Sequence, residues 1–331
     1  MQLSNWQRRS IRLIGSAALI VGIFWFIPIS EVIEALSSVN LALAAAGGSL
    51  MLLSAYLEAI ALWLPLKRVG IPTTSWNVFE VKMITRFYGQ FLPSELMGSV
   101  LKLHRLAGPT KQWGEVAAGL AYCRLVNFLV LALLGLTFWA IEMPSGPGRW
   151  VGVLLAGMAV TLIGIHLAVV SPVVYRFARR VIGVIPFRSG RGKLADKFVK
   201  LGRTMLDSYR LFGDTLSTVT ILAVIRHAMG IASFGLIALS LDIHVSYLTI
   251  GWIRVVLHTL MMLPISLSGI GLREGSLVIL LQEYSVPASE AVALAFLLFA
   301  TTLIANALGG LFELKNLLLP SASDATRSTS E

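Results

Sequence analysis

An arginine and a glutamate stand side by side in an otherwise apolar stretch, MMLPISLSGIGLREGSLVILL, residues 261–281. The guanidinium of Arg273 offers N–H donors in a planar fork, which suits the oxygens of a phosphate group. Glu274 can hold that fork in place, or accept a hydrogen bond from a substrate hydroxyl or amine. The structural alternative is an ion pair that ties this segment to its neighbours. Because ionisable residues in apolar segments are by default functional hypotheses, we predict an anion site here.

The residues before this pair predict an interrupted helix. Pro264 lacks a backbone N–H and ends the helix that precedes it, while Gly269 and Gly271 permit backbone conformations closed to other residues. The hydroxyl of Ser268 can satisfy backbone groups that the break leaves without partners. A helix that restarts near Leu272 directs its first N–H groups toward the break, which favours an anionic ligand.

A similar break occurs earlier in the chain, in SWNVFEVKMITRFYGQFLPSELMGSVLKLHRL, residues 75–106. Pro93, Gly98 and Lys102 repeat the spacing P-x4-G-x3-[KR] of the later segment. We predict that Lys102 is the binding cation of this copy. Its structural alternative is a long side chain whose ammonium group reaches the membrane surface.

Further charged residues lie in or near apolar segments. Arg86 and Arg254 precede the two prolines and are candidate cations of the same cavity, with a purely structural ion pair as the alternative for each. We interpret Glu58, His227 and His258 as hydrogen-bonding residues of the core.

The composition predicts a membrane protein. The chain has 331 residues, of which 56% are hydrophobic and 13% are charged, and its net charge is +10. Soluble domains carry about 25% charged residues. The basic residues cluster beside apolar segments, where they set orientation and favour anionic lipids, so we expect no nucleic-acid partner. With one cysteine, Cys123, and no zinc, nucleotide or nucleophile motif, we expect no metal, no cofactor and no enzyme activity.

Several stretches are apolar enough to cross a bilayer, which takes about 20 helical residues. They cover residues 11–28, 41–65, 113–141, 150–170, 216–241 and 288–312. A strongly basic segment, residues 171–214, is predicted to be a cytoplasmic loop, and the same rule places both termini in the cytoplasm. We expect one membrane domain over residues 1–315 and a disordered tail over residues 316–331.

Residues 75–106 and 247–284 do not fit as plain spans, because the arms after the prolines are short and polar. We predict two re-entrant helical hairpins, although every arm could instead be counted as a full span. The first hairpin follows a span that ends inside and the second follows one that ends outside, so they should enter from opposite faces. The predicted fold is an all-α integral membrane protein with about six spans and two hairpins in an inverted-topology repeat, which is typical of transporters.

The motifs LPISLSGIGLREGSLVILL and FLPSELMGSVLKLHRL resemble the lysylphosphatidylglycerol synthase transmembrane (flippase-like) family. In that family an acidic residue usually follows the glycine of the first motif; here Ser99 follows Gly98, while Lys102 keeps the basic position. The resemblance implies a multi-pass protein of the bacterial inner membrane. It also implies a module that moves lipids between leaflets, without the soluble aminoacyl-transfer domain of the best-known members.

The leading hypothesis is therefore a flippase or transporter that moves an anionic or phosphate-bearing lipid through a cation-lined cavity near the bilayer midplane. Membrane lipids are the expected partners. Two alternatives stay open: a non-catalytic membrane partner of a lipid-modifying enzyme, and a membrane enzyme that acts on a lipid-linked phosphate. Such an enzyme would need facing acids, yet the position that pairs with Glu274 is Ser99.

Overall fold

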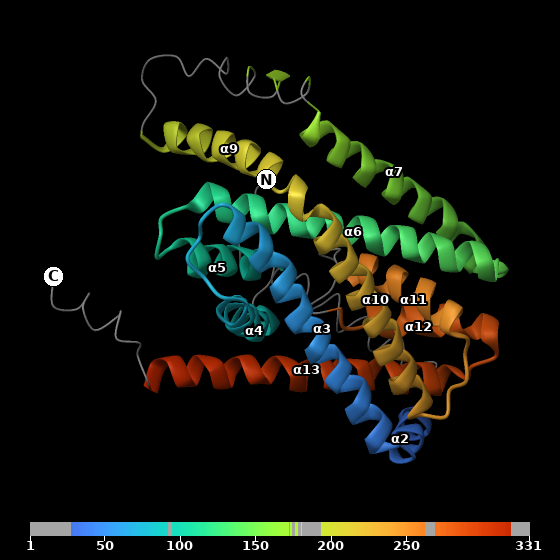
Figure 1. The fold of residues 1–331 in the computed structure, drawn as a ribbon. Helices are drawn as coiled ribbons and strands as arrows, with labels where there is room; N and C mark the ends of the chain where they lie inside the picture. Colours follow the sequence, from blue (N-terminus) through green and yellow to red (C-terminus); the bar gives the residue numbers. More distant parts are fainter. Residues whose placement is uncertain are drawn as a thin grey trace, which may run out of the picture.

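The computed structural model describes residues 28–91, 95–171, 173, 176, 177, 180, 193–261 and 269–318 (Figure 1). Within these ranges every regular element is a helix, so the predicted all-α membrane protein is confirmed. The α-helices are α2 (Ile29–Ser37), α3 (Leu41–Arg68), α4 (Ser75–Phe91), α5 (Glu95–Ala107), α6 (Trp113–Glu142), α7 (Val151–Val170), α9 (Lys193–Leu211), α10 (Leu216–Leu239), α11 (Tyr247–Met261), α12 (Leu272–Leu281) and α13 (Ala288–Leu318). Three short 3₁₀ helices are η1 (Gly146–Trp150), η2 (Gly213–Thr215) and η3 (Gln282–Tyr284).

Five helices in the described ranges are long and apolar enough to cross a membrane: α3, α6, α7, α10 and α13. They coincide with the five predicted spans that begin after residue 40, and each extends at most six residues beyond the predicted end. The remaining predicted span, residues 11–28, lies almost wholly outside the described residues. Figure 1 shows α6 and α13 running in opposite chain directions, as spans of alternating orientation require.

The two predicted hairpins correspond to the pairs α4–α5 and α11–α12, whose members pack on each other. These helices contain 17, 13, 15 and 10 residues. A residue of α-helix adds about 1.5 Å, so all four are shorter than a hydrocarbon core of about 30 Å. Pro93 and Pro264 lie in the breaks, outside the described residues. The re-entrant paths and their opposite entry stay predictions.

The basic segment between the fourth and fifth spans, residues 171–214, contains a helix, and its place as a cytoplasmic loop stays a prediction. Its second half forms α9, which packs along α6 and contacts α7. Leu201, Met205, Ser208 and Tyr209 recur at helical spacing on the face that turns inward, and Tyr209 packs against Tyr122 of α6 with ring centroids 5.2 Å apart. The many charges of the segment obscured this amphipathic period.

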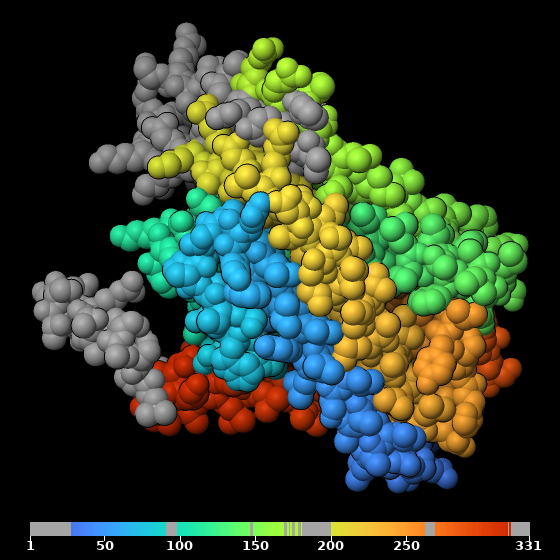
Figure 2. All heavy atoms as spheres, in the orientation of Figure 1, coloured from blue at the N-terminus to red at the C-terminus, as the bar shows by residue number. Residues whose placement is uncertain are grey.

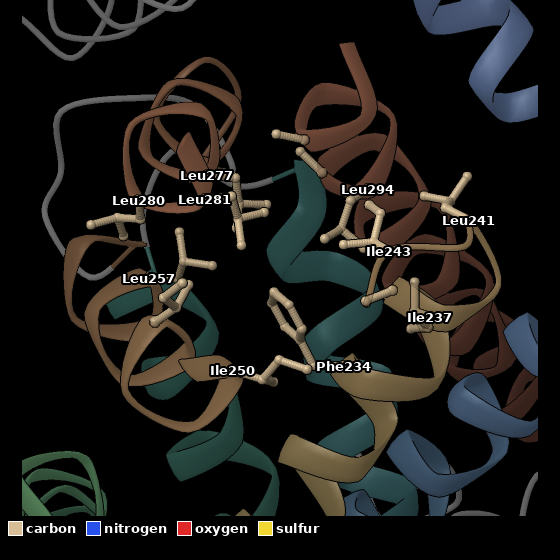
Figure 3. Packing of buried hydrophobic residues seen from close by; sticks show 14 of the residues in the cluster. Phe234, Ile237, Leu241, Ile243, Ile250, Leu257, Leu277, Leu280, Leu281 and Leu294 are labelled. Carbon is tan, nitrogen blue, oxygen red and sulfur yellow. The ribbon is translucent and has the colours of Figure 1, made fainter. Parts of the chain in front are cut away.

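The bundle has two main packing regions. On one face α3 and α10 lie side by side along their length (Figure 2). The second hairpin packs into a separate apolar cluster, where Leu257 of α11 and Leu277 of α12 face Phe234 of α10 and Leu294 of α13 (Figure 3). Helix α13 contacts both α4 and α12, and therefore connects the two hairpins.

The contact between α13 and α4 depends on a glycine. A Cβ atom placed on Gly309 would lie 2.0 Å from the carbonyl oxygen of Met83 in α4. No side chain fits at that separation, so the two backbones can approach only because Gly309 lacks one. This packing positions α4, which carries two of the basic residues of the site.

Candidate functional site

A single carboxylate oxygen in the middle of the bundle receives three cationic donors. The Oε2 atom of Glu58 lies 2.7 Å from Nζ of Lys82, 3.2 Å from a guanidinium nitrogen of Arg226 and 3.3 Å from one of Arg86. Lys82 also donates to the carbonyl oxygen of Ala55, at 2.7 Å. These contacts join α3, α4 and α10 through side chains that are far apart in the sequence.

A second group of contacts extends this cluster to α6 and α11. His227, beside Arg226 on α10, has its Nε2 atom 3.3 Å from the carbonyl oxygen of Asn127 in α6. Its Nδ1 atom lies 3.3 Å from a guanidinium nitrogen of Arg254 in α11. A guanidinium nitrogen of Arg226 also lies 3.4 Å from Nε2. We assign the neutral imidazole with its proton on Nε2, because the closer partner of Nε2 is a carbonyl oxygen, which only accepts, and the partner of Nδ1 is a guanidinium, which only donates. The ring thus adds no charge to the cluster.

The site lies halfway along the membrane-crossing helices. Glu58, Asn127 and Arg226 all occupy central turns of α3, α6 and α10. The first helix of each predicted hairpin brings a cation to it, since Arg86 belongs to α4 and Arg254 to α11. We call the set Glu58, Lys82, Arg86, Arg226, His227 and Arg254 the central basic cluster.

The central basic cluster is partly accessible. Lys82 is 2% exposed and the side chain of Arg226 is 11% exposed, whereas those of Glu58 and Arg86 are each 34% exposed. Buried charges near a membrane centre are costly unless they are paired or line a polar cavity. The cluster is therefore packed in protein around Lys82 and Arg226 and is partly exposed at Glu58 and Arg86.

Three of the predicted cations lie in or beside the central basic cluster. Arg86 and Arg254 are members of the central basic cluster, and Lys102 of α5 interacts electrostatically with Glu58. His258 of α11 likewise interacts with Glu58 and Arg86. By contrast, Gly98 makes only an ordinary contact, since a Cβ there would lie 3.7 Å from the carbonyl oxygen of Thr85.

The Arg-Glu pair that first indicated an anion site has different surroundings. The guanidinium of Arg273 lies over the ring of Phe299 in α13, 5.2 Å from its centroid, in a cation–π contact. Glu274 is 2% exposed and accepts a hydrogen bond of 2.6 Å from the backbone N–H of Gly271. It therefore caps the start of α12, where its charge also complements the helix dipole.

The two glycines of this break adopt backbone conformations that favour glycine. Gly269 and Gly271 have φ angles of +79° and +84°, which side-chain-bearing residues rarely adopt. The structure brings Arg86 and Arg254 into the central basic cluster with Lys102 nearby, whereas the contact described for Arg273 is with Phe299 of α13. The remaining predicted residues, Ser268 with Pro93 and Pro264, lie outside the described residues.

Lys82 and Arg226 were missed by the sequence reasoning, and Glu58 and His227 were interpreted only as core residues. A signal was present: Arg226 and His227 stand in the middle of the span predicted at residues 216–241. A charged residue at that depth calls for a partner. Only the folded chain shows that the partner is Glu58, 168 residues away in the sequence.

Among the residues that the structure describes, no three His, Cys, Asp or Glu side chains are placed to hold a metal ion. The donor set of the cluster is cationic, which suits an anion.

Comparison with known proteins gives one match. The family model for the lysylphosphatidylglycerol synthase TM region matches residues 12–310. No curated protein and no solved structure matches the chain.

Proposed function

The chain belongs to the family of lysylphosphatidylglycerol synthase TM regions, and on that premise we propose that it carries an anionic lipid between membrane leaflets. The head group would bind at the central basic cluster while the acyl chains stay in the hydrocarbon. The observation that carries the proposal is that Arg86 and Arg226 contact the carboxylate of Glu58, and Arg254 contacts His227 beside Arg226, halfway along the spanning helices.

The cluster provides the hydrogen-bond donors that an anionic head group would bind. Guanidinium groups bind phosphate oxygens through two parallel N–H donors and keep their charge in apolar surroundings. Glu58 occupies the place of an anion in the cluster, because its Oε2 atom already accepts from three cations. A bound phosphate would share these donors or take them over.

Transport also requires that the site open to each leaflet in turn. Each predicted hairpin is tied to a spanning helix by a carboxylate. Glu313 of α13 accepts from Tyr88 at 3.1 Å and from Arg105 at 2.5 Å. Glu142, at the end of α6, accepts from Thr249 of α11 at 2.7 Å. Figure 1 shows these ends of α6 and α13 on opposite sides of the molecule, so one contact could loosen while the other holds.

Lipid exchange in reconstituted vesicles tests the proposal. The purified protein is placed in liposomes with a head-group-labelled anionic lipid, and an impermeant quencher reports exchange between leaflets. We expect exchange by the wild type and at least about tenfold slower exchange by Arg226→Ala, because a charge-assisted hydrogen bond contributes about 1.5–3 kcal/mol. The variant Arg273→Ala reports separately on the other predicted anion site.

Arg203→Ala is the matched control, since Arg203 is an exposed arginine of α9 outside the cluster. Exchange that is unaffected by Arg226→Ala would contradict a cation-lined path. No exchange of any anionic lipid by the wild type would favour a non-catalytic partner of a lipid-modifying enzyme.

A further inference from the structure

The charges of the central basic cluster do not balance. Among the described side chains, Glu58 is the only carboxylate that contacts its arginines. Lys82 makes the shortest contact to Glu58, at 2.7 Å, and is itself 2% exposed. This lysine is sufficient to offset the single negative charge. The positive charges of Arg86, Arg226 and Arg254 are then in excess.

Loss of a proton from these arginines cannot relieve the excess, because arginine stays charged in proteins. Arg86 and Arg226 approach the same oxygen atom, at 3.3 and 3.2 Å, so the two guanidiniums lie close together and repel each other. His227 contributes no negative charge. The cluster therefore favours a ligand that supplies more than one negative charge.

The donors of the cluster also outnumber its acceptors. A guanidinium has five N–H donors. In the described structure Arg254 donates only to His227, and Arg86 donates only to Glu58. Arg86 and Glu58 each have 34% of their side chains exposed, so the remaining donors of Arg86 lie on the partly exposed side of the cluster. A ligand with several acceptor oxygens would fit there.

We infer that the cluster selects a terminal phosphate, as in a phosphomonoester or diphosphate lipid, over a phosphodiester lipid. The inference rests on the proposed lipid-binding function and specifies its substrate class. A phosphodiester carries one negative charge and would leave two of the three arginines unbalanced. A phosphomonoester carries about −1.5 to −2 at pH 7 and presents three strong acceptor oxygens.

A binding comparison tests the inference independently of transport. The full-length protein in an uncharged detergent is titrated with two lipids of identical acyl chains, dioctanoyl phosphatidic acid and dioctanoyl phosphatidylglycerol. We expect phosphatidic acid to bind at least about tenfold more tightly, the effect of one additional charge-assisted hydrogen bond. Equal affinities, or a preference for phosphatidylglycerol, would overturn the inference and leave the proposed function standing.

Variants that remove a negative or a positive charge should change the lipid preference in opposite directions. A purely structural effect of the substitutions would not do so. Glu58→Gln removes the negative charge, so it should increase the preference for phosphatidic acid. Arg254→Gln removes a positive charge, so it should reduce that preference, and Arg254→Lys should restore part of it. If Glu58→Gln does not fold, the two Arg254 variants alone decide, because unchanged selectivity in Arg254→Gln would also overturn the inference.

Inorganic phosphate distinguishes a lipid from a free ion. It should displace phosphatidic acid only at much higher concentration, because it lacks acyl chains. If it binds as tightly as phosphatidic acid, the charge inference holds but the ligand is free phosphate, and the lipid function is wrong. If neither lipid binds, both the inference and the proposed function are wrong.

Discussion

Glu58 holds together charges that would otherwise repel one another. Its Oε2 atom contacts Lys82, Arg86 and Arg226 at once. Burying an ion pair is not in itself a strong source of stability, but removing one partner leaves the other charge without compensation. The residue therefore stabilises the cluster, and in the proposed function it would compete with an anionic ligand for the same donors.

The first prediction is that Glu58→Gln lowers stability by about 3 kcal/mol, because Lys82 would remain buried without its carboxylate. Thermal unfolding in detergent measures this change. The control is Glu31→Gln, since Glu31 is exposed in α2 and makes no contact with the cluster. If both variants melt at the wild-type temperature, Glu58 is not the counter-charge of the cluster.

Most helices could be predicted from the sequence, because their positions follow from local patterns of residues. Apolar length located α3, α6, α7, α10 and α13, and the proline-glycine breaks located the short helices between them. Helix α9 was missed because its basic residues suggested a loop, although its apolar period was present.

The composition of the site was predictable only in part. Arg86, Arg254 and Lys102 could be proposed from their positions in the two similar segments. The role of Glu58 could not, because the contacts that define it join α3 to α4 and α10. Such contacts form only when distant helices pack together, and the residue pattern of a single sequence does not show which helices pack. The capping role of Glu274 was likewise open until the path of the Gly269–Gly271 turn was known.

The second prediction concerns the packing of α13 on α4. Gly309→Ala should lower stability by about 1–3 kcal/mol, because the added methyl group would meet the Met83 carbonyl oxygen. Gly164→Ala in α7 is the matched control, since a Cβ there meets nothing within 4 Å and alanine favours helix. Thermal unfolding of the two variants measures the difference. A Gly309→Ala protein as stable as the control would show that α4 and α13 are not closely packed.

For the whole molecule, the predicted arrangement is an inverted repeat with hairpins that enter from opposite faces. The lengths of α4, α5, α11 and α12 favour it, because none of them reaches across a hydrocarbon core. Both hairpins contact α13. Their first helices deliver Arg86 and Arg254 to one cluster. Two such units around one site would give the symmetry that alternating access uses.

The third prediction tests this orientation. In a Cys123→Ser background, single cysteines are introduced at two exposed residues, Lys111 after the first hairpin and Gln282 at the end of the second. An impermeant maleimide added to intact cells should label Gln282→Cys and leave Lys111→Cys unlabelled until the membrane is opened. Labelling of both cysteines from the same side would contradict opposite entry.

The most direct test of the account is to locate the bound head group. Phosphatidic acid with a photoactivatable group beside its phosphate is incorporated into nanodiscs with the full-length protein, and the cross-linked peptides are identified by mass spectrometry. The account predicts cross-links in α3, α4, α10 and α11 around Glu58, Arg86, Arg226 and Arg254, and their loss when unlabelled phosphatidic acid is added. Cross-links confined to the exposed basic face of α9, or unaffected by that competitor, would contradict a head-group site at the central basic cluster.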